Sequence, residues 1–178
     1  MRSPEAYEEF KSHFKSGSCK KGDSIQMVGD VCYNIYILKS GLVKQYRYKE
    51  DGSEHIIWFL FEEDLFTAFR SFSTQENSIN GLEALEDCEF ISMSRSVCLE
   101  LAEKYRPIET FFRELMEGYY IESEDRLFFL QALSAKQKYL YLLEHMPQFL
   151  QRIPQKEISS FLGITRETLS RMRKYVAS

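Results

Sequence analysis

The sequence predicts an α+β fold in three parts: a small β-barrel or double-sheet roll, one long helix, and two short helices at the carboxyl end. Short β-forming runs separated by turn residues fill residues 20–93. A wide apolar stripe at helical spacing follows Pro107. Two shorter helical patterns then meet at Gly163. These three observations predict domains at residues 1–106, 107–132 and 133–178.

The composition is that of a folded, water-soluble protein. Hydrophobic residues make up 44% of the 178 residues and aromatic residues 15%, which supports a sizeable core. No apolar run approaches the ~20 residues of a membrane span, and the N-terminus lacks a signal-peptide pattern. We therefore expect a cytoplasmic protein that does not interact with membranes.

The barrel region is predicted from runs of strand-forming residues. A short helix is expected within residues 1–18, where Phe10 and Phe14 lie one turn apart. Residues 33–38 form a β-rich run that ends at Ser40-Gly41. The following strands are expected at residues 42–48, 55–61 and 90–93, with a hairpin turn at residues 50–53.

The last two dozen residues have the layout of a helix-turn-helix. Gly163 breaks the first helix, and Thr165 is a good N-cap for the second. At about 100° per residue, Leu169, Met172 and Val176 share one side of the second helix. The opposite arc holds Arg166, Glu167, Ser170, Arg171 and Lys174. One stripe can pack on the first helix while the other enters a DNA major groove.

The charge distribution agrees with local binding to nucleic acid. The net charge is −4, but residues 155–178 hold five basic and two acidic side chains, a net charge of +3. The remaining residues carry −7, from 18 basic and 25 acidic side chains. Attraction to phosphates is therefore expected only at the C-terminal end.

Residues 154–171 resemble the DNA-binding motif of the Crp/Fnr family of bacterial transcription regulators. The family core Gly-x-[Ser/Thr]-Arg-Glu-Thr-[Val/Leu]-[Gly/Ser]-Arg is matched position by position by residues 163–171. The resemblance implies base contacts by Arg166, Glu167 and Arg171, through guanine O6 and N7 or cytosine N4. The residues placed for phosphate contacts are Gln155, Lys156, Thr165, Thr168, Ser170 and Lys174.

The barrel region resembles the sensor domain of the same family, a jelly roll of the cyclic-nucleotide-binding type. Lys21-Gly22-Asp23, Gly29-Asp30 and residues 36–41 stand where family strands and turns are expected, and residues 83–89 resemble the last strand pair. The resemblance implies a transcription regulator rather than an enzyme, with double-stranded DNA and RNA polymerase as partners.

The cyclic-nucleotide signature of the family is missing. Relatives hold the cyclic phosphate with an Arg-Ser pair and the ribose with a Gly-Glu pair, whereas this chain has Ser78-Ile79 and Thr67-Ala68 there. Arg70 lies in the same segment. Burying a phosphate without a cation is costly, so we expect the barrel not to bind cyclic AMP. Two alternatives remain open: the barrel binds another small effector, or the side chains of Phe66, Phe69 and Phe72 fill its pocket.

The long helix is predicted to pair two copies of the chain. A helix of about 25 residues spans roughly 38 Å, more than a small barrel covers. It can pack wholly against its own barrel or against the same helix of a second subunit, and we favour the homodimer because a two-fold DNA reader needs two recognition helices. The predicted seam is Ile108, Phe111, Phe112, Leu115 and Tyr119.

Two other functional classes compete with a DNA-binding regulator. A ligand-binding or protein-interaction module whose C-terminal helices do not bind DNA remains the alternative. A cupin-like enzyme is disfavoured because no nucleophile–base pair or metal-ligand spacing is present. The four cysteines are scattered, which predicts reduced thiols and no metal or other cofactor. Family DNA-binding domains continue into a β-hairpin wing, so we expect a branch without the wing or a truncated chain.

Overall fold

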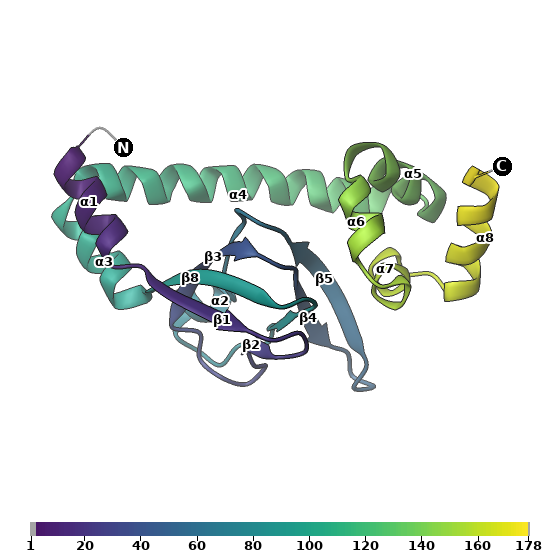
Figure 1. Ribbon diagram of the computed structural model, residues 1–178, viewed down its shortest axis with the longest axis horizontal. Helices are drawn as coiled ribbons and strands as arrows, with labels where there is room; N and C mark the ends of the chain where they lie inside the picture. Colours follow the sequence, from purple (N-terminus) through teal and green to yellow (C-terminus); the bar gives the residue numbers. More distant parts are fainter. Residues whose placement is uncertain (1–2, 178) are drawn as a thin grey trace. The chain divides into compact units, whose positions relative to one another are not determined.

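The computed structural model describes residues 3–177, with side chains described through Lys174. The chain forms two compact units, Met1–Glu117 and Gly118–Ser178. The first contains all the strands of the described residues, and the second is helical (Figure 1). The predicted α+β class is confirmed. The domain boundaries at residues 106 and 132 stay predictions.

Two four-stranded antiparallel sheets form the roll of the first unit. One has the order β1 (Lys15–Cys19), β8 (Cys88–Ser94), β3 (Asn34–Ser40) and β6 (Leu65–Phe66). The other has the order β2 (Ser24–Gln26), β7 (Gly81–Ala84), β4 (Val43–Tyr48) and β5 (Glu54–Leu60). The double-sheet roll is therefore confirmed, but its first strand begins before the expected start at residue 20. The missed strand consists of Lys, Ser, Gly and Cys, and pairing with β8 stabilises it in spite of its weak β-propensity.

Side chains alternate between the two faces of the first sheet. On β3, Tyr36 and Leu38 point into the roll, and Ile35 belongs to a separate cluster on the outer face. The ring of Tyr36 stacks on that of Phe66, with 5.2 Å between centroids. The inner cluster comprises Tyr36, Leu38, Val43, Phe66, Leu82, Ala84 and Cys88.

Three helices cover the outer face of this sheet. They are α1 (Pro4–Ser12), α3 (Arg95–Lys104) and the first turns of α4 (Arg106–Ala132), and a short helix, α2 (Phe69–Thr74), follows β6 (Figure 1). Pro107 falls in the first turn of α4, as predicted. The outer cluster comprises Ala6, Phe10, Ile35, Met93, Cys98, Leu101 and Ile108.

The predicted hairpin turn at residues 50–53 joins β4 to β5. The N–H of Lys49 donates to the carbonyl of Ser53 at 2.8 Å, and Gly52 has a φ of 78°. The carboxylate of Asp51 accepts from the Ser53 hydroxyl at 2.6 Å and from its N–H at 2.8 Å. These bonds lower the pKa of Asp51. A carboxylate therefore stabilises the turn.

Short helices make up the rest of the second unit. They are α5 (Ala135–His145), α6 (Pro147–Arg152), α7 (Gln155–Leu162) and α8 (Arg166–Ala177). Pro147 is favourable in a first helical turn, and burial of Phe149 and Leu150 stabilises α6. Within the described residues, no helix is long and apolar enough to cross a membrane.

Candidate nucleic-acid interface and sensor unit

The turn between α7 and α8 is defined by backbone hydrogen bonds. Gly163 adopts the left-handed conformation, with φ 68° and ψ 33°. The N–H of Ile164 reaches back to the carbonyl of Ser159 at 3.0 Å, as in a Schellman motif. Glycine suits this position because a side chain there is strained. The chain therefore leaves α7 sharply and enters α8 after two more residues.

Thr165 caps α8 as predicted. Its hydroxyl accepts from the N–H of Thr168 at 3.2 Å, and its carbonyl accepts from the N–H of Leu169 at 3.0 Å. Leu169 has no exposed surface, Met172 is half-buried, and Ile158, Phe161 and Leu162 of α7 are also buried. The apolar stripe of α8 is thus anchored in the core of the unit. Val176 lies outside the described side chains.

The opposite face of α8 is open to solvent. Arg166, Glu167, Ser170, Arg171 and Lys174 are all exposed. The Arg171 guanidinium donates to the Thr168 hydroxyl at 3.4 Å. Hydrogen bonds from its own backbone N–H and from Thr165 lower the pKa of Glu167, so this carboxylate is ionised at neutral pH. The three predicted base-contacting residues therefore lie on one turn-and-a-half of exposed helix.

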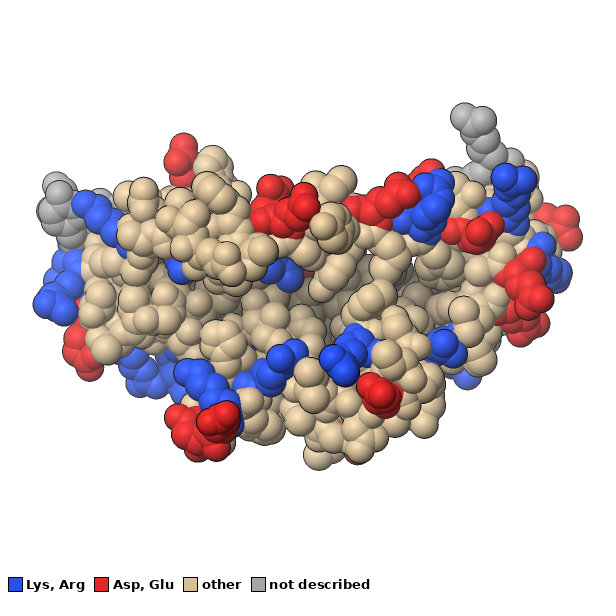
Figure 2. All heavy atoms as spheres, turned by 180° about the vertical axis from the view of Figure 1, so that it is seen from behind, with Lys and Arg blue, Asp and Glu red and all other residues tan. Residues whose placement is uncertain are grey.

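The arginines of this face are not held in salt bridges. In the described part of the chain, neither Arg166 nor Arg171 forms an ion pair. Figure 2 shows Lys and Arg side chains on the surface of the C-terminal unit, at the left of the view, as well as along the rest of the face that it displays. Of the residues expected at phosphates, Gln155, Lys156 and Thr165 are exposed, as are Ser170 and Lys174, whereas Thr168 is half-buried.

The five residues expected to line a sensor pocket do not come together. Thr67 lines an apolar cavity, but Ala68 is buried and Ser78 is buried with its hydroxyl bonded to the Asn80 carbonyl at 2.7 Å. The Arg70 side chain is 69% exposed and lies 3.6 Å from Glu76. Ile79 is 42% exposed. Strand alternation and the α2 turn send these side chains in different directions, and the sensor pocket stays a prediction.

Comparison with known proteins gives the family. The family described as cyclic nucleotide-binding domain matches residues 17–105, half of the chain. The fumarate and nitrate reduction regulatory protein of Yersinia pestis is 26% identical over 166 residues, which are 86% of this chain and 65% of that protein. The regulatory protein HlyX of Actinobacillus pleuropneumoniae is 26% identical over 164 residues, which cover 86% of this chain and 68% of that protein. The chain belongs to the Crp/Fnr family of transcription regulators.

Solved structures of the family share its fold. FixK2 from Bradyrhizobium japonicum superposes with a TM-score of 0.78 at 20% identity, covering 92% of this chain and 84% of that one. The present chain spans about two thirds of the length of the curated Crp/Fnr relatives that it matches.

The first residue of the predicted seam on the long helix is not available to a second subunit. Ile108 is completely buried in its own unit, so its assignment to a subunit interface was wrong. Phe111 and Phe112 pack on the same cluster, with the Phe10 ring centroid 5.7 Å from that of Phe111. Leu115 lines the apolar cavity. Ile108 was assigned to the seam because helical periodicity shows where an apolar stripe lies but not which surface covers it. The remaining seam residues stay predictions.

Other residues of α4 expose large apolar side chains instead. Tyr119, the fifth predicted seam residue, is 43% exposed. Tyr120, Ile121 and Phe128 are 66%, 60% and 66% exposed, and Leu127 is 53% exposed. The predicted seam contained none of Tyr120, Ile121, Leu127 and Phe128. Helical periodicity was the available signal, because at about 100° per residue Ile121 and Phe128 lie on the side of α4 opposite Ile108.

The cysteines and histidines form no metal site in the described residues, where no group of three His, Cys, Asp or Glu side chains could hold an ion. All four cysteines are free, and Cys32, Cys88 and Cys98 are buried. Cys19 faces Cys88 across the β1–β8 pair. Burial raises the pKa of Cys19 and of Cys98 to about 11. Both thiols are therefore protonated at neutral pH and unreactive as nucleophiles.

Proposed function

We propose that this chain is a sequence-specific DNA-binding transcription regulator that acts as a homodimer. The observation that carries the proposal is the two-sided α8: Leu169 anchors one side in the core, and Arg166, Glu167 and Arg171 stand exposed on the other. A helix of this kind can enter a major groove without unfolding its own unit. Family membership supports the same function.

Each exposed side chain has a chemical role in this proposal. The guanidinium groups of Arg166 and Arg171 donate to guanine, and the ionised Glu167 accepts from cytosine N4. Lys156 and Lys174 neutralise phosphates, while Gln155, Thr165 and Ser170 hydrogen-bond to them. Thr168 is half-buried and its hydroxyl contacts that of Thr165, the cap of α8, so its role is to orient Arg171.

The homodimer is supported by the exposed apolar side chains of α4. Solvent-exposed Ile121 and Phe128 are seven residues apart, which places them on one side of the helix. Large apolar side chains gathered on one face are typical of protein–protein contacts. We therefore place the seam at Tyr120, Ile121, Leu127 and Phe128 rather than at Ile108.

The experiment that tests this function combines self-association with DNA binding. We expect wild-type protein to sediment as a dimer and to shift mixed-sequence duplexes in a gel. The double variant Ile121→Glu, Phe128→Glu should sediment as a monomer, because two buried charges in each seam are costly. Its affinity for DNA should fall at least about tenfold, since one recognition helix loses the contribution of the other.

The matched control is Met27→Glu, which adds a charge at an exposed apolar residue of the sensor unit, 59% exposed. It should sediment and bind DNA like the wild type. Wild-type protein that binds no duplex, or a monomeric double variant with unchanged DNA affinity, would contradict the proposal.

The proposed effector of the sensor unit is not a cyclic nucleotide. The residues at the expected phosphate-binding position are Ser78, bonded to the main chain, and exposed Ile79. The nearby Arg70 is turned to solvent, where it pairs with Glu76. A cyclic phosphate entering the roll would therefore lose its hydration without gaining a cation.

A further inference from the structure

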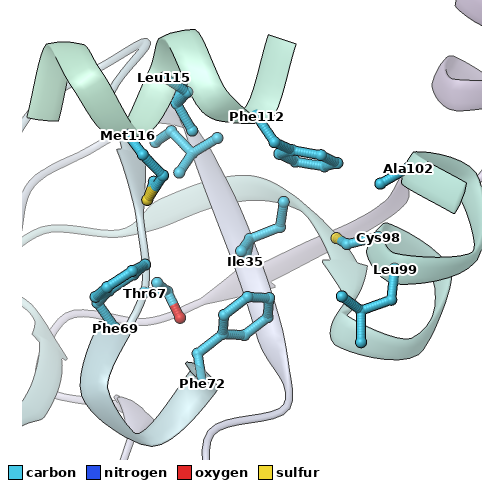
Figure 3. Close-up of a pocket in the computed structure, with 11 residues that line it drawn as sticks. Ile35, Thr67, Phe69, Phe72, Cys98, Leu99, Ala102, Phe112, Leu115 and Met116 are labelled. Atoms are coloured by element: carbon cyan, nitrogen blue, oxygen red, sulfur yellow. The ribbon is translucent and has the colours of Figure 1, made fainter. Parts of the chain in front are cut away.

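An apolar cavity lies on the outer face of the sheet formed by β1, β8, β3 and β6. It has a volume of about 280 Å³, is open at one side, and is lined by residues of β3, β6, α2, α3 and α4 and by Thr67, all within the first unit. Figure 3 shows Phe112, Leu115 and Met116 reaching down from α4 towards Phe72 and Ile35, with Cys98, Leu99 and Ala102 at one side.

This cavity is separate from the interior of the roll. Ile35, Leu65 and Thr67 line it, whereas the alternate residues Tyr36 and Phe66 point into the roll, where their stacked rings fill space. The cavity therefore lies on the opposite side of the sheet from the cluster that occupies the barrel.

The lining offers no partner to a charged group. Every lining side chain is apolar apart from Thr67 and Cys98, and none is charged. The Thr67 hydroxyl donates to the carbonyl of Asn34 at 2.8 Å, so its proton is already used. Burial keeps the Cys98 thiol protonated. An ionised molecule would lose its hydration here without compensation, so the chemistry selects a neutral apolar molecule.

The volume limits the size of the occupant. A cavity of about 150 Å³ lined by aliphatic and aromatic side chains binds benzene, so about twice that volume accommodates a molecule of two fused rings. An α-helix, with a diameter of about 10–12 Å including side chains, does not fit. Phe69 and Leu99, which are 41% and 53% exposed, leave apolar surface at the rim.

We propose that this cavity is a binding site for a small, uncharged, apolar molecule of about the size of two fused rings. Its role as the effector site rests on the proposed function, whereas binding itself does not. Because Phe112, Leu115 and Met116 belong to α4, an occupant contacts the start of the long helix as well as the barrel. Binding there stabilises the packing of α4 on the sensor unit.

The test uses 1-aminonaphthalene, a neutral two-ring probe whose fluorescence changes in apolar surroundings. We expect saturable binding to the full chain with a dissociation constant of about 10–100 µM. Ala102→Leu places three more carbons in the cavity and should weaken binding at least about tenfold. The matched control Glu103→Leu adds an apolar side chain at an exposed position of the same helix and should bind like the wild type.

A second filling variant, Cys98→Met, keeps the test decisive if Ala102→Leu fails to fold, as judged by its thermal melt. The same ring system with a carboxylate, 1-naphthoate, should bind at least about tenfold more weakly. Absence of saturable binding, equal binding by the filled variants, equal binding of 1-naphthoate, or displacement of the probe by cyclic AMP would each overturn the proposal. If a variant no longer binds the probe but binds DNA unchanged, the proposed regulator function stands. This outcome distinguishes the cavity proposal from the proposed function.

Discussion

Replacing Arg171 with alanine is expected to weaken binding to an operator duplex about 10- to 100-fold, because one good arginine–guanine contact is worth about 1–3 kcal/mol. Arg171 is exposed and forms no salt bridge within the described residues, so the folded protein should lose little stability. A gel-shift titration on the operator and on single-base variants measures both effects. Preference for guanine should disappear at one base pair in each half-site.

The charge-matched control is Lys49→Ala, which removes an exposed cation from the β4–β5 turn of the sensor unit. It should change operator affinity less than about twofold, because a distant surface charge is screened by salt. If Arg171→Ala and Lys49→Ala bind the operator equally well, Arg171 does not read a base.

Replacing Gly41 with alanine is expected to cost about 3–5 kcal/mol of unfolding free energy, the largest loss of stability that we predict for a single methyl group. Gly41 has a φ of +102°, which strains any side chain. An added Cβ would also lie 2.6 Å from the carbonyl oxygen of Asp87 and 2.6 Å from Cys88 Sγ. The carbonyl belongs to the backbone and cannot rotate away, so the β3–β4 connection or the start of β8 has to shift.

Gly52→Ala separates strain from collision. Gly52 also has a positive φ, +78°, but an added Cβ there meets nothing within 4 Å. Its cost should be about 1 kcal/mol, from the backbone conformation alone. Urea denaturation of both variants measures the difference. Equal losses in the two proteins would mean that the contact with Asp87 and Cys88 does not restrict Gly41.

Local signals in the sequence were sufficient for much of the fold. The Gly52 turn, the Thr165 cap and the Gly163 break each depend on a few adjacent residues, and the structure has all three. The β1 strand was missed because its stability comes from β8, more than sixty residues later in the chain. Helix α6 was not among the predicted elements, although a proline such as Pro147 is compatible with a first helical turn.

The two candidate sites also differ in whether local sequence signals are sufficient to predict them. The exposed face of α8 could be predicted because one helix carries it, and helical periodicity alone separates Arg166 and Arg171 from Leu169. The apolar cavity could not, because its wall combines five elements between Ile35 and Met116. The predicted seam of α4 included Ile108, which its own unit buries, because periodicity shows where an apolar stripe lies but not what covers it.

The central claim is that the exposed face of α8 reads the sequence of duplex DNA, and in vitro selection from random duplexes tests it most directly. The account predicts enrichment of a sequence with two-fold symmetry, its half-sites centred about 10–10.5 base pairs apart. Selection with the variant Arg166→Ala, Arg171→Ala should lose that preference. Failure of the wild type to enrich any sequence, or the same enriched sequence with the double variant, would contradict it.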